Sequence, residues 1–454
     1  MRVSFHTFGC KVNQYETQVL SRRFAAAGHL VLPDDTGCDV AVVNSCTVTA
    51  AGDRKTRQLL RRLRREHPDA VLVLTGCYPQ AFPDKAAALD ADVITGARNR
   101  AGILAAVERF LATGDKQVDI LPHLPGEAFE SMKTDAFSGH TRAFVKVQDG
   151  CENFCAYCII PFARGPLRSK DPAALRAELQ ELAAAGYREV VLSGINLTAY
   201  ARERGGSFLE ALYAARGIPG LDRIRLGSME PDTISPADIR EMAALGFVCP
   251  HFHLSLQSGC DATLRRMGRK YDTAAYLRVL AAFREHFPGA AITTDMMVGF
   301  PGETDEDFAA SEAFAVKAGF AKIHVFSYSP RAGTAAAAMP DQISGAVKRV
   351  RSASLIRTAA RLRRDFLSGM TGTVQQVLIE ERGKDGQTGY TPNYTPVTLR
   401  SDADLTGQIL PVRITGLSAD GDGCLGETDL PQPLRQDRAA FPIAPSDIPQ
   451  RGDA

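Results

Sequence analysis

The sequence predicts an α/β protein in three parts: an N-terminal parallel α/β domain, an open (β/α)6 partial barrel and a small C-terminal β-barrel. Three observations support this fold class. Up to about residue 110, apolar runs alternate with amphipathic helical stretches, which is typical of a parallel sheet. Six strand-like segments follow, and helical stretches come after the first five. The last part changes to short alternating runs broken by Gly and Pro, which indicates a barrel of short strands.

Length and composition exclude several classes of protein. A chain of 454 residues is long enough for two or three domains. A net charge of +1 argues against a globally basic nucleic-acid binder, so RNA binding must come from local patches. The N-terminus has no apolar signal core and no apolar stretch approaches membrane-spanning length, so we expect a cytoplasmic protein with no membrane partner. Ten cysteines in a reducing compartment favour metal or redox use over disulfides.

The N-terminal domain is predicted to span residues 1–113. Its expected strands are residues 3–7, 40–44, 71–75 and 92–95. Cys10, Cys46 and Cys77 each come two or three residues after one of the first three strands. Because the carboxyl ends of parallel strands meet at one edge of a sheet, these thiols are expected to gather there. The alternative is three separate buried cysteines that only fill space, and the repeated placement favours the shared site.

A linker is predicted at residues 114–138, where Pro and Gly interrupt any periodicity, followed by the core at residues 139–367. The expected core strands are residues 143–147, 189–193, 223–228, 251–257, 291–298 and 322–327. Successive βα units joined by right-handed crossovers curl into a barrel or a doubly wound sheet. Six units are too few for a closed eight-stranded barrel, so an open one is expected, with its active site at the C-terminal strand ends.

The C-terminal β-barrel is predicted at residues 370–434, with short strands at residues 374–379, 397–399 and 408–414. The tail at residues 435–454 is rich in Pro and charge, and we expect it to be disordered.

The strongest motif is a group of three cysteines, Cys151, Cys155 and Cys158, on the loop after the first core strand. Cubane 4Fe–4S clusters are normally held by four thiolates, so three leave one iron free for a substrate or cofactor. Zinc is the alternative, but it would need a fourth Cys or His at comparable spacing. None lies between residues 161 and 249, and His140 is the near candidate upstream.

The C-x3-C-x2-C spacing resembles the signature of radical S-adenosylmethionine (SAM) enzymes. This resemblance implies that the amino and carboxylate groups of SAM chelate the open iron. It also implies that an electron from the cluster cleaves SAM to release a 5'-deoxyadenosyl radical, chemistry that belongs to the cofactor.

Two sets of three cysteines, an α/β domain before the core and a small β-domain after it together resemble the methylthiotransferases, over roughly residues 1–434. The segments TFGCKVNQYET (7–17), CIIPFARG (158–165) and DMMVGFPGET (295–304) are most similar to the branch that modifies N6-threonylcarbamoyladenosine in tRNA. The resemblance implies that one set, Cys10, Cys46 and Cys77, holds an auxiliary 4Fe–4S cluster. It implies that the other, Cys151, Cys155 and Cys158, holds the radical SAM cluster, and that the β-domain is a TRAM domain that grips tRNA.

The family's reaction inserts a methylthio group at carbon 2 of an N6-modified adenine next to the anticodon. One SAM would supply the methyl group and another the radical, while the auxiliary cluster presents the sulfur. We therefore expect two 4Fe–4S clusters and SAM as cofactors, tRNA as partner, and an electron donor such as flavodoxin or ferredoxin. We expect a monomer.

Four residues at the predicted mouth of the core are candidate SAM contacts. Gly194 follows the second strand, although Ser-Gly-Ile-Asn departs from the Gly-Gly-Glu pattern of the superfamily. Glu230 and Gln257 end the third and fourth strands, where they could instead cap their own loops. Tyr157, inside the cysteine loop, could lie against the adenine of SAM or simply shield the cluster.

Two basic runs, residues 54–65 and 348–364, concentrate Arg and Lys on predicted helices. Such concentration suits phosphate contact, and a solvated helix face explains it equally well.

Other functions remain as alternatives. The same chemistry could act on N6-isopentenyladenosine in tRNA or on an aspartate of a ribosomal protein. The chain could also be a non-enzymatic two-cluster electron carrier or iron–sulfur RNA-binding protein, although carriers usually close every iron with cysteine.

Overall fold

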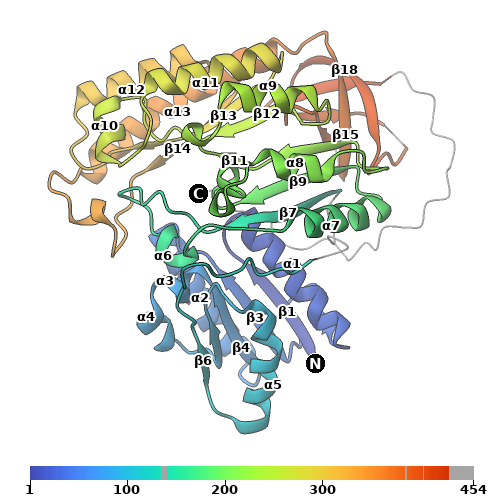
Figure 1. Cartoon of the computed structure of the whole chain (residues 1–454), viewed down its shortest axis with the longest axis vertical. Helices are drawn as coiled ribbons and strands as arrows, with labels where there is room; N and C mark the ends of the chain where they lie inside the picture. Colours follow the sequence, from blue (N-terminus) through green and yellow to red (C-terminus); the bar gives the residue numbers. More distant parts are fainter. Residues whose placement is uncertain (134–140, 384–385, 402, 429–454) are drawn as a thin grey trace.

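Figure 1 shows the computed structural model, which describes residues 1–133, 141–383, 386–401 and 403–428. The N-terminal domain (blue) lies below the core (green to yellow), and the C-terminal barrel (red) lies beside the core. The predicted tail, 435–454, and the last residues of the predicted barrel, 429–434, lie outside the described residues. The α/β fold class is confirmed, including the closed C-terminal barrel.

The N-terminal domain is a six-stranded parallel sheet in the order β2-β1-β3-β4-β5-β6. Its strands are β1 (Arg2–Thr7), β2 (Leu30–Val31), β3 (Val40–Ser45), β4 (Val71–Gly76), β5 (Val93–Thr95) and β6 (Gln117–Asp119). Its helices are α1 (Lys11–Ala26), α2 (Ala50–Glu66), α3 (Cys77–Ala81), α4 (Pro83–Ala87) and α5 (Ile103–Thr113), with a 3-10 turn η1 (Arg100–Gly102). The central strands β3 and β4 are buried along their whole length, which is why they read as continuous apolar runs.

Strand β6 lies within the segment predicted as linker and pairs with β5 at the edge of the sheet. Its sequence, Gln-Val-Asp, is too short and too polar to show a strand period, so the sequence could not indicate it.

The core consists of two four-stranded sheets, β10-β9-β7-β8 and β11-β12-β13-β14, which are parallel apart from β8. Its strands are β7 (Arg142–Asp149), β8 (Arg168–Ser169), β9 (Glu189–Gly194), β10 (Arg223–Leu226), β11 (Ser228–Met229), β12 (His251–Leu254), β13 (Ala291–Val298) and β14 (Lys322–Ser327). The predicted third strand, 223–228, is divided between the two sheets at Gly227, whose N–H donates to Leu192 O at 2.8 Å. The six predicted strands therefore follow one another in order around an open barrel.

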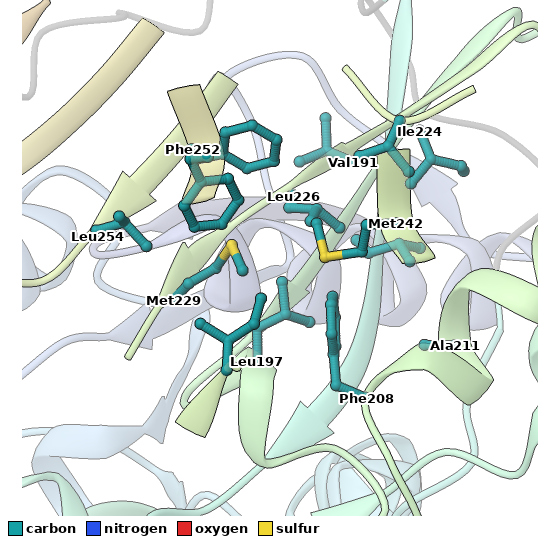
Figure 2. Packing of buried hydrophobic residues seen from close by; sticks show 14 of the residues in the cluster. Val191, Leu197, Phe208, Ala211, Ile224, Leu226, Met229, Met242, Phe252 and Leu254 are labelled. Atoms are coloured by element: carbon teal, nitrogen blue, oxygen red, sulfur yellow. The ribbon is translucent and has the colours of Figure 1, made fainter. Parts of the chain in front are cut away.

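Helices cover the outside of this open barrel (Figure 1). They are α7 (Pro172–Ala184), α8 (Leu209–Ala215), α9 (Pro236–Ala244), α10 (Asp261–Arg266), α11 (Thr273–His286), α12 (Asp305–Ala318) and α13 (Gly345–Ser368). Figure 2 shows Leu226, Met229, Met242 and Phe252 packing together in the buried layer between sheet and helices. Tyr15 of α1 belongs to the same buried cluster, so the N-terminal domain and the core share packing. None of the described helices combines the length and apolarity needed to cross a membrane.

The C-terminal part closes into a five-stranded barrel in the order β15-β16-β17-β19-β18. Its strands are β15 (Val374–Gly383), β16 (Gly386–Tyr390), β17 (Pro396–Leu399), β18 (Ile409–Leu417) and β19 (Cys424–Glu427). All pairs are antiparallel except β17 with β19. The barrel encloses its own small core, which includes Val377, Val397 and Val412.

Candidate functional site

The first three thiols lie at the carboxyl edge of the N-terminal sheet. Cys10 precedes α1, three residues after β1, whereas Cys46 and Cys77 follow β3 and β4 directly because both strands run one residue further than predicted. Burial raises the pKa of Cys46 to about 12, and the negative charge of the Cys77 and Cys10 thiolates adds to the effect. The pKa of Cys77 is likewise raised by burial and by Cys10. The charges of these thiols therefore act on one another.

Two glycines allow the thiol-bearing loops to come together. Gly9 has φ +112°, and a Cβ there would lie 2.8 Å from Cys46 Cβ. Gly76 has φ +100°, and a Cβ there would lie 2.5 Å from Asn44 Oδ1. Only glycine combines this backbone conformation with such close approach, so these two positions belong to the site.

The second three thiols lie on the loop between β7 and the short helix α6 (Ile160–Arg164). Burial raises the pKa of Cys158 to about 12 and that of Cys151 to about 11, and in both cases the charge of Cys155 adds to the effect. The loop closes with a hydrogen bond from Cys158 N to Cys155 O at 2.9 Å, and Phe154 takes a left-handed conformation with φ 47°. These thiols also form one group.

Hydrogen-bond donors contact the sulfur atoms of both groups. Arg164 Nε donates to Cys77 Sγ at 3.1 Å, Arg269 Nη1 to Cys155 Sγ at 3.3 Å, and Asn196 Nδ2 lies 4.0 Å from Cys151 Sγ. Metals bind the thiolate form, which cations and hydrogen-bond donors stabilise. The donor sets therefore fit iron–sulfur clusters with three cysteine ligands each.

Among the described residues, no three His, Cys, Asp or Glu side chains surround the position of a single metal ion. A four-iron cube is wider than one ion, so its thiolates lie further apart than the ligands of a mononuclear centre. His140, the fourth ligand considered for zinc, lies outside the described residues.

Two of the four candidate SAM contacts meet at Arg269, beside Cys155. Glu230 forms an ion pair with Arg269, and Tyr157 Oη lies 3.4 Å from Arg269 Nη1. Burial raises the pKa of Tyr157 and of Glu230, although Arg269 opposes both shifts. Ser255 O accepts a hydrogen bond from Arg269 Nη2 at 3.3 Å.

The other two candidates lie at the end of β9 and just after β12, which belong to different sheets of the core. Gly194 ends β9, where a Cβ would lie 3.0 Å from the Gln148 side chain, and the same Gln148 accepts a hydrogen bond from Asn196 N at 2.7 Å. Gln257 has φ 69° and bridges to Met296, while its side-chain Oε1 is buried with no hydrogen-bond partner among the described residues. Gln257 thus offers a free acceptor, and the positive φ shows a constrained backbone.

Sequence reasoning missed Arg164 and Arg269. Arg164 lies in the segment 158–165 that carried the family resemblance, so a buried role could have been suspected from its position. Arg269 has no such signal, because it contacts Cys155 from 114 residues further along the chain.

A cavity of about 700 Å³ opens beside the second thiol group. It is lined by two of the cysteines, by two phenylalanines and by small residues: Cys155, Cys158, Phe154, Phe162, Ala156, Gly333, Thr334, Ala335, Ala337 and Ala338. The two phenyl rings are 60% and 51% exposed and meet edge to face at 6.1 Å. The wall is fixed to the cysteine loop by a hydrogen bond from Ala336 N to Ala156 O at 2.7 Å.

The same wall loop also reaches the first thiol group. Arg331 Nη2 donates to Thr47 Oγ1 at 2.6 Å and pairs with Asp53 at 2.9 Å. Thr47 directly follows Cys46, so one loop borders the cavity and contacts the neighbour of an N-terminal thiol.

Comparison with known proteins agrees with this arrangement. Residues 145–315 match the radical SAM superfamily, and residues 2–96 match uncharacterized protein family UPF0004. The chain is 37% identical over 420 residues to the threonylcarbamoyladenosine tRNA methylthiotransferase MtaB of Bacillus subtilis, covering 91% of this chain and 93% of that protein. The corresponding protein of Thermotoga maritima is 35% identical, covering 92% and 95%.

A third relative has a different substrate in its name. It is the tRNA-2-methylthio-N(6)-dimethylallyladenosine synthase of Pelotomaculum thermopropionicum, 34% identical over 90% of this chain and 94% of that protein. Among solved structures, the radical SAM methyltransferase TsrM of Kitasatospora setae matches with a TM-score of 0.54 at 16% identity, covering 71% of this chain and 72% of that one, which shows the shared fold.

An open barrel with three thiols on the loop after its first strand defines a radical SAM protein, and this class implies SAM and a 4Fe–4S cluster as cofactors. Within that class the chain belongs to the methylthiotransferase family, because relatives with that function are more than 30% identical along nearly their whole length. The family resemblance seen in the sequence is confirmed.

Proposed function

We propose that this protein methylthiolates carbon 2 of N6-threonylcarbamoyladenosine next to the anticodon of tRNA, giving 2-methylthio-N6-threonylcarbamoyladenosine. One observation carries the proposal: two separate groups of three thiols occur in a chain whose relatives at 37% and 35% identity are named for this reaction. Cytoplasmic tRNA is the substrate, and a small electron-transfer protein such as flavodoxin or ferredoxin supplies electrons.

In this proposal Cys151, Cys155 and Cys158 hold the radical SAM cluster. The N-terminal thiols, Cys10, Cys46 and Cys77, hold an auxiliary 4Fe–4S cluster. When bound, these groups would supply the one-electron cleavage of SAM and the sulfur atom for transfer. Three thiolates per cluster leave one iron of each without a protein ligand, as the reaction requires.

The chain's own residues would then position SAM. Arg269 donates a hydrogen bond to Cys155 Sγ and orients Glu230, whose carboxylate would accept hydrogen bonds from hydroxyl groups. The unpaired Gln257 Oε1 is an acceptor for an ammonium group, and the backbone carbonyl of Gly194 would be a second acceptor. Tyr157 would lie against the adenine.

The cavity beside Phe154 and Phe162 would receive the target base. RNA-binding proteins hold splayed-out bases by stacking them on aromatic side chains, and two exposed phenyl rings beside a thiol group suit that task. The wall loop that also contacts Thr47 would place the base near both clusters.

We also propose a role for each part of the chain. Residues 1–113 would form the auxiliary-cluster domain, residues 139–367 the radical SAM core, and residues 370–434 a TRAM domain that grips tRNA, with residues 114–138 as the connection. The protein would act as a monomer.

The decisive experiment measures nucleosides in tRNA by mass spectrometry from a strain lacking this protein. We expect loss of the methylthio-threonylcarbamoyl nucleoside, accumulation of its precursor, and restoration by the wild-type chain. Persistence of that nucleoside would overturn the substrate assignment.

The second candidate is N6-dimethylallyladenosine, which a relative at 34% identity over most of the chain supports. The same mass spectra distinguish the two substrates, because the strain would then lack the methylthio product of N6-dimethylallyladenosine and keep that of N6-threonylcarbamoyladenosine. If both tRNA products persist, ribosomal proteins from the same strain should be analysed for loss of an aspartate methylthio group. An anaerobically reconstituted protein that cannot cleave SAM under strong reductant would instead indicate an electron carrier.

A further inference from the structure

We propose that Arg164 is a positioning residue that joins the two thiol groups and, through its hydrogen bond to Cys77, raises the reduction potential of the auxiliary cluster. The inference rests on the proposed assignment of Cys10, Cys46 and Cys77 to that cluster.

Arg164 is anchored to the radical SAM loop. It is the last residue of α6, which begins two residues after Cys158, and its side chain is fully buried. The next residue, Gly165, accepts a hydrogen bond from Cys151 N at 3.0 Å. Pro166 also lies close to Gly150, where a Cβ would lie 1.8 Å from Pro166 O. The backbone of Arg164 is thus packed and hydrogen-bonded against the loop that carries the second thiol group.

Its guanidinium contacts the first thiol group. Nε donates to Cys77 Sγ at 3.1 Å, and Nη2 donates to Asn13 Oδ1 at 2.7 Å. The same Asn13 oxygen lies 3.6 Å from Cys10 Sγ. Asn13 Nδ2 donates to Ser45 O at 3.1 Å, immediately before Cys46. One side chain therefore contacts one thiol directly and, through Asn13, the loops that carry the other two.

The carboxylate that pairs with Arg164 also pairs with other cations, so it neutralises the charge of Arg164 only in part. Its Nη1 lies 2.5 Å and its Nη2 3.1 Å from the two oxygens of Glu16, but Glu16 also pairs with Arg100 at 3.0 Å and Lys146 at 2.8 Å. A second buried carboxylate, Asp149, lies 2.5 Å from Lys146 and 3.5 Å from Arg164, so two carboxylates together serve these three cations. A thiolate-bound cluster beside Arg164 would be a further buried anion, and buried anions require a cation or hydrogen-bond donors.

The expected effect on the cluster follows from charge. Reduction adds an electron to an already anionic cluster, and a positive N–H donor to a ligand sulfur stabilises the reduced form more than the oxidised form. Hydrogen bonds to the sulfurs are among the determinants of cluster potential. Loss of Arg164 should therefore shift the potential to more negative values.

The test isolates the auxiliary cluster in the full-length chain by replacing Cys151, Cys155 and Cys158 with Ala. This chain and its Arg164→Gln and Arg164→Lys derivatives are reconstituted anaerobically, assayed for iron, and titrated with reductant while the cluster is followed by electron paramagnetic resonance. We expect a negative shift in Arg164→Gln and a smaller negative shift in Arg164→Lys, which keeps the charge but loses the Nε–Sγ hydrogen bond.

Arg100→Gln is the matched control, because Arg100 is equally buried and shares Glu16 but is not among the residues found in contact with a thiol. Its potential should match that of the parent. An equal shift in Arg100→Gln, or unchanged potentials in iron-loaded Arg164→Gln and Arg164→Lys, would overturn the role of Arg164. If Arg164→Gln does not fold, the Lys variant alone decides by the same criterion. A parent chain that binds no iron would instead refute the auxiliary cluster itself, and the iron assay distinguishes this failure.

Discussion

Arg225 Nε donates to Glu189 Oε1 over 2.6 Å between neighbouring strands of the core, and both side chains are fully buried. Arg223 pairs with the other Glu189 oxygen at 2.5 Å. The remaining N–H groups of the two arginines donate to carbonyls of the C-terminal barrel, at 3.0 Å to Gln376 O and 2.8 Å to Pro392 O. One carboxylate thus orients the two side chains that dock the barrel on the core.

Replacing Glu189 with Gln should strongly destabilise this junction. The substitution leaves Arg223 and Arg225 buried without a counter-charge, a change that typically costs about 3–5 kcal/mol. The free energy of unfolding in urea measures it. Glu181→Gln is the control, since the Glu181–Lys133 pair is largely exposed and should contribute less than about 1 kcal/mol. Equal stabilities for the two variants would contradict this account of the junction.

The same carboxylate predicts a pH dependence. Burial alone would raise the pKa of Glu189, but Arg225, Arg223 and Arg142 together lower it to about 2, against 4.5 for the ordinary group. The resulting stabilisation is fully present above pH 4.5 and is lost as the pH falls through about 2, because the unfolded chain binds the proton first. The stability difference between wild type and Glu189→Gln should therefore shrink by about 3 kcal/mol over this interval. A difference that stays constant with pH would show that Glu189 is not charged.

Single cysteine substitutions should separate the two clusters. With two cubanes the wild type should bind about eight irons. Cys155→Ala should lose half of the iron and all SAM cleavage, whereas Cys77→Ala should lose half of the iron, keep SAM cleavage and form no methylthio product. Iron assay and chromatography of 5'-deoxyadenosine provide the measurements. Cys260→Ala, outside both groups, should keep full iron content; equal iron loss in all three variants would argue against two separate sites.

The sequence predicted both thiol groups because strand ends and loop spacing are local features. Cys46 and Cys77 meet through the parallel sheet, whose order follows from short βα connections. Arg269 and Gln376 could not be predicted in the same way, since each contacts a residue more than a hundred positions away along the chain. Strand β6 was missed because an edge strand of three residues carries no period.

Only the structure separates the cations of the two basic runs that form ion pairs within the protein from those that are exposed. Arg64 pairs with Asp90 and Asp92, at 3.2 and 2.8 Å, and so serves the fold. Likewise, Arg351 on α13 pairs with Glu303 at 2.7 Å. Other members of the two runs are exposed, and for these no ion pair is found within the described part of the chain: Arg54, Lys55, Arg61, Arg349, Arg357, Arg361 and Arg364.

Exposed cations at the start of α2 should therefore contact tRNA phosphates. Arg54 and Lys55 follow Asp53, which pairs with Arg331, two residues before the first cavity-lining residue of that loop. Each phosphate contact contributes about one to the slope of log affinity against log salt, so the Arg54→Ala, Lys55→Ala double variant should lower that slope by about two. Filter binding of tRNA over a range of salt measures it. Arg65→Ala, at the far end of α2 and paired with Glu66, should leave the slope unchanged; identical slopes for all chains would exclude this end of α2 from the tRNA interface.

The exposed phenyl ring of Phe154 should hold the target base. Stacking of a base on an aromatic side chain contributes about 1–3 kcal/mol, so Phe154→Ala should weaken binding of an anticodon stem-loop by about 5- to 150-fold, while Phe154→Tyr should largely restore it. The left-handed backbone at Phe154 makes each variant strained to a similar degree, which isolates the ring. Tyr213→Ala removes an aromatic ring that is 40% exposed on α8 and serves as the matched control, with no change expected.

SAM cleavage tests whether the cavity contacts the electron donor rather than RNA. Cleavage driven by dithionite should be the same in Phe154→Ala and wild type, because the ring contacts neither Arg269 nor Glu230 among the described interactions. Cleavage driven by reduced flavodoxin should also be unchanged if the ring contacts only RNA. A variant that binds the stem-loop normally but receives electrons slowly from flavodoxin would assign the phenyl pair to the electron donor, since the exposed rings lie beside two of the thiols proposed to hold the cluster.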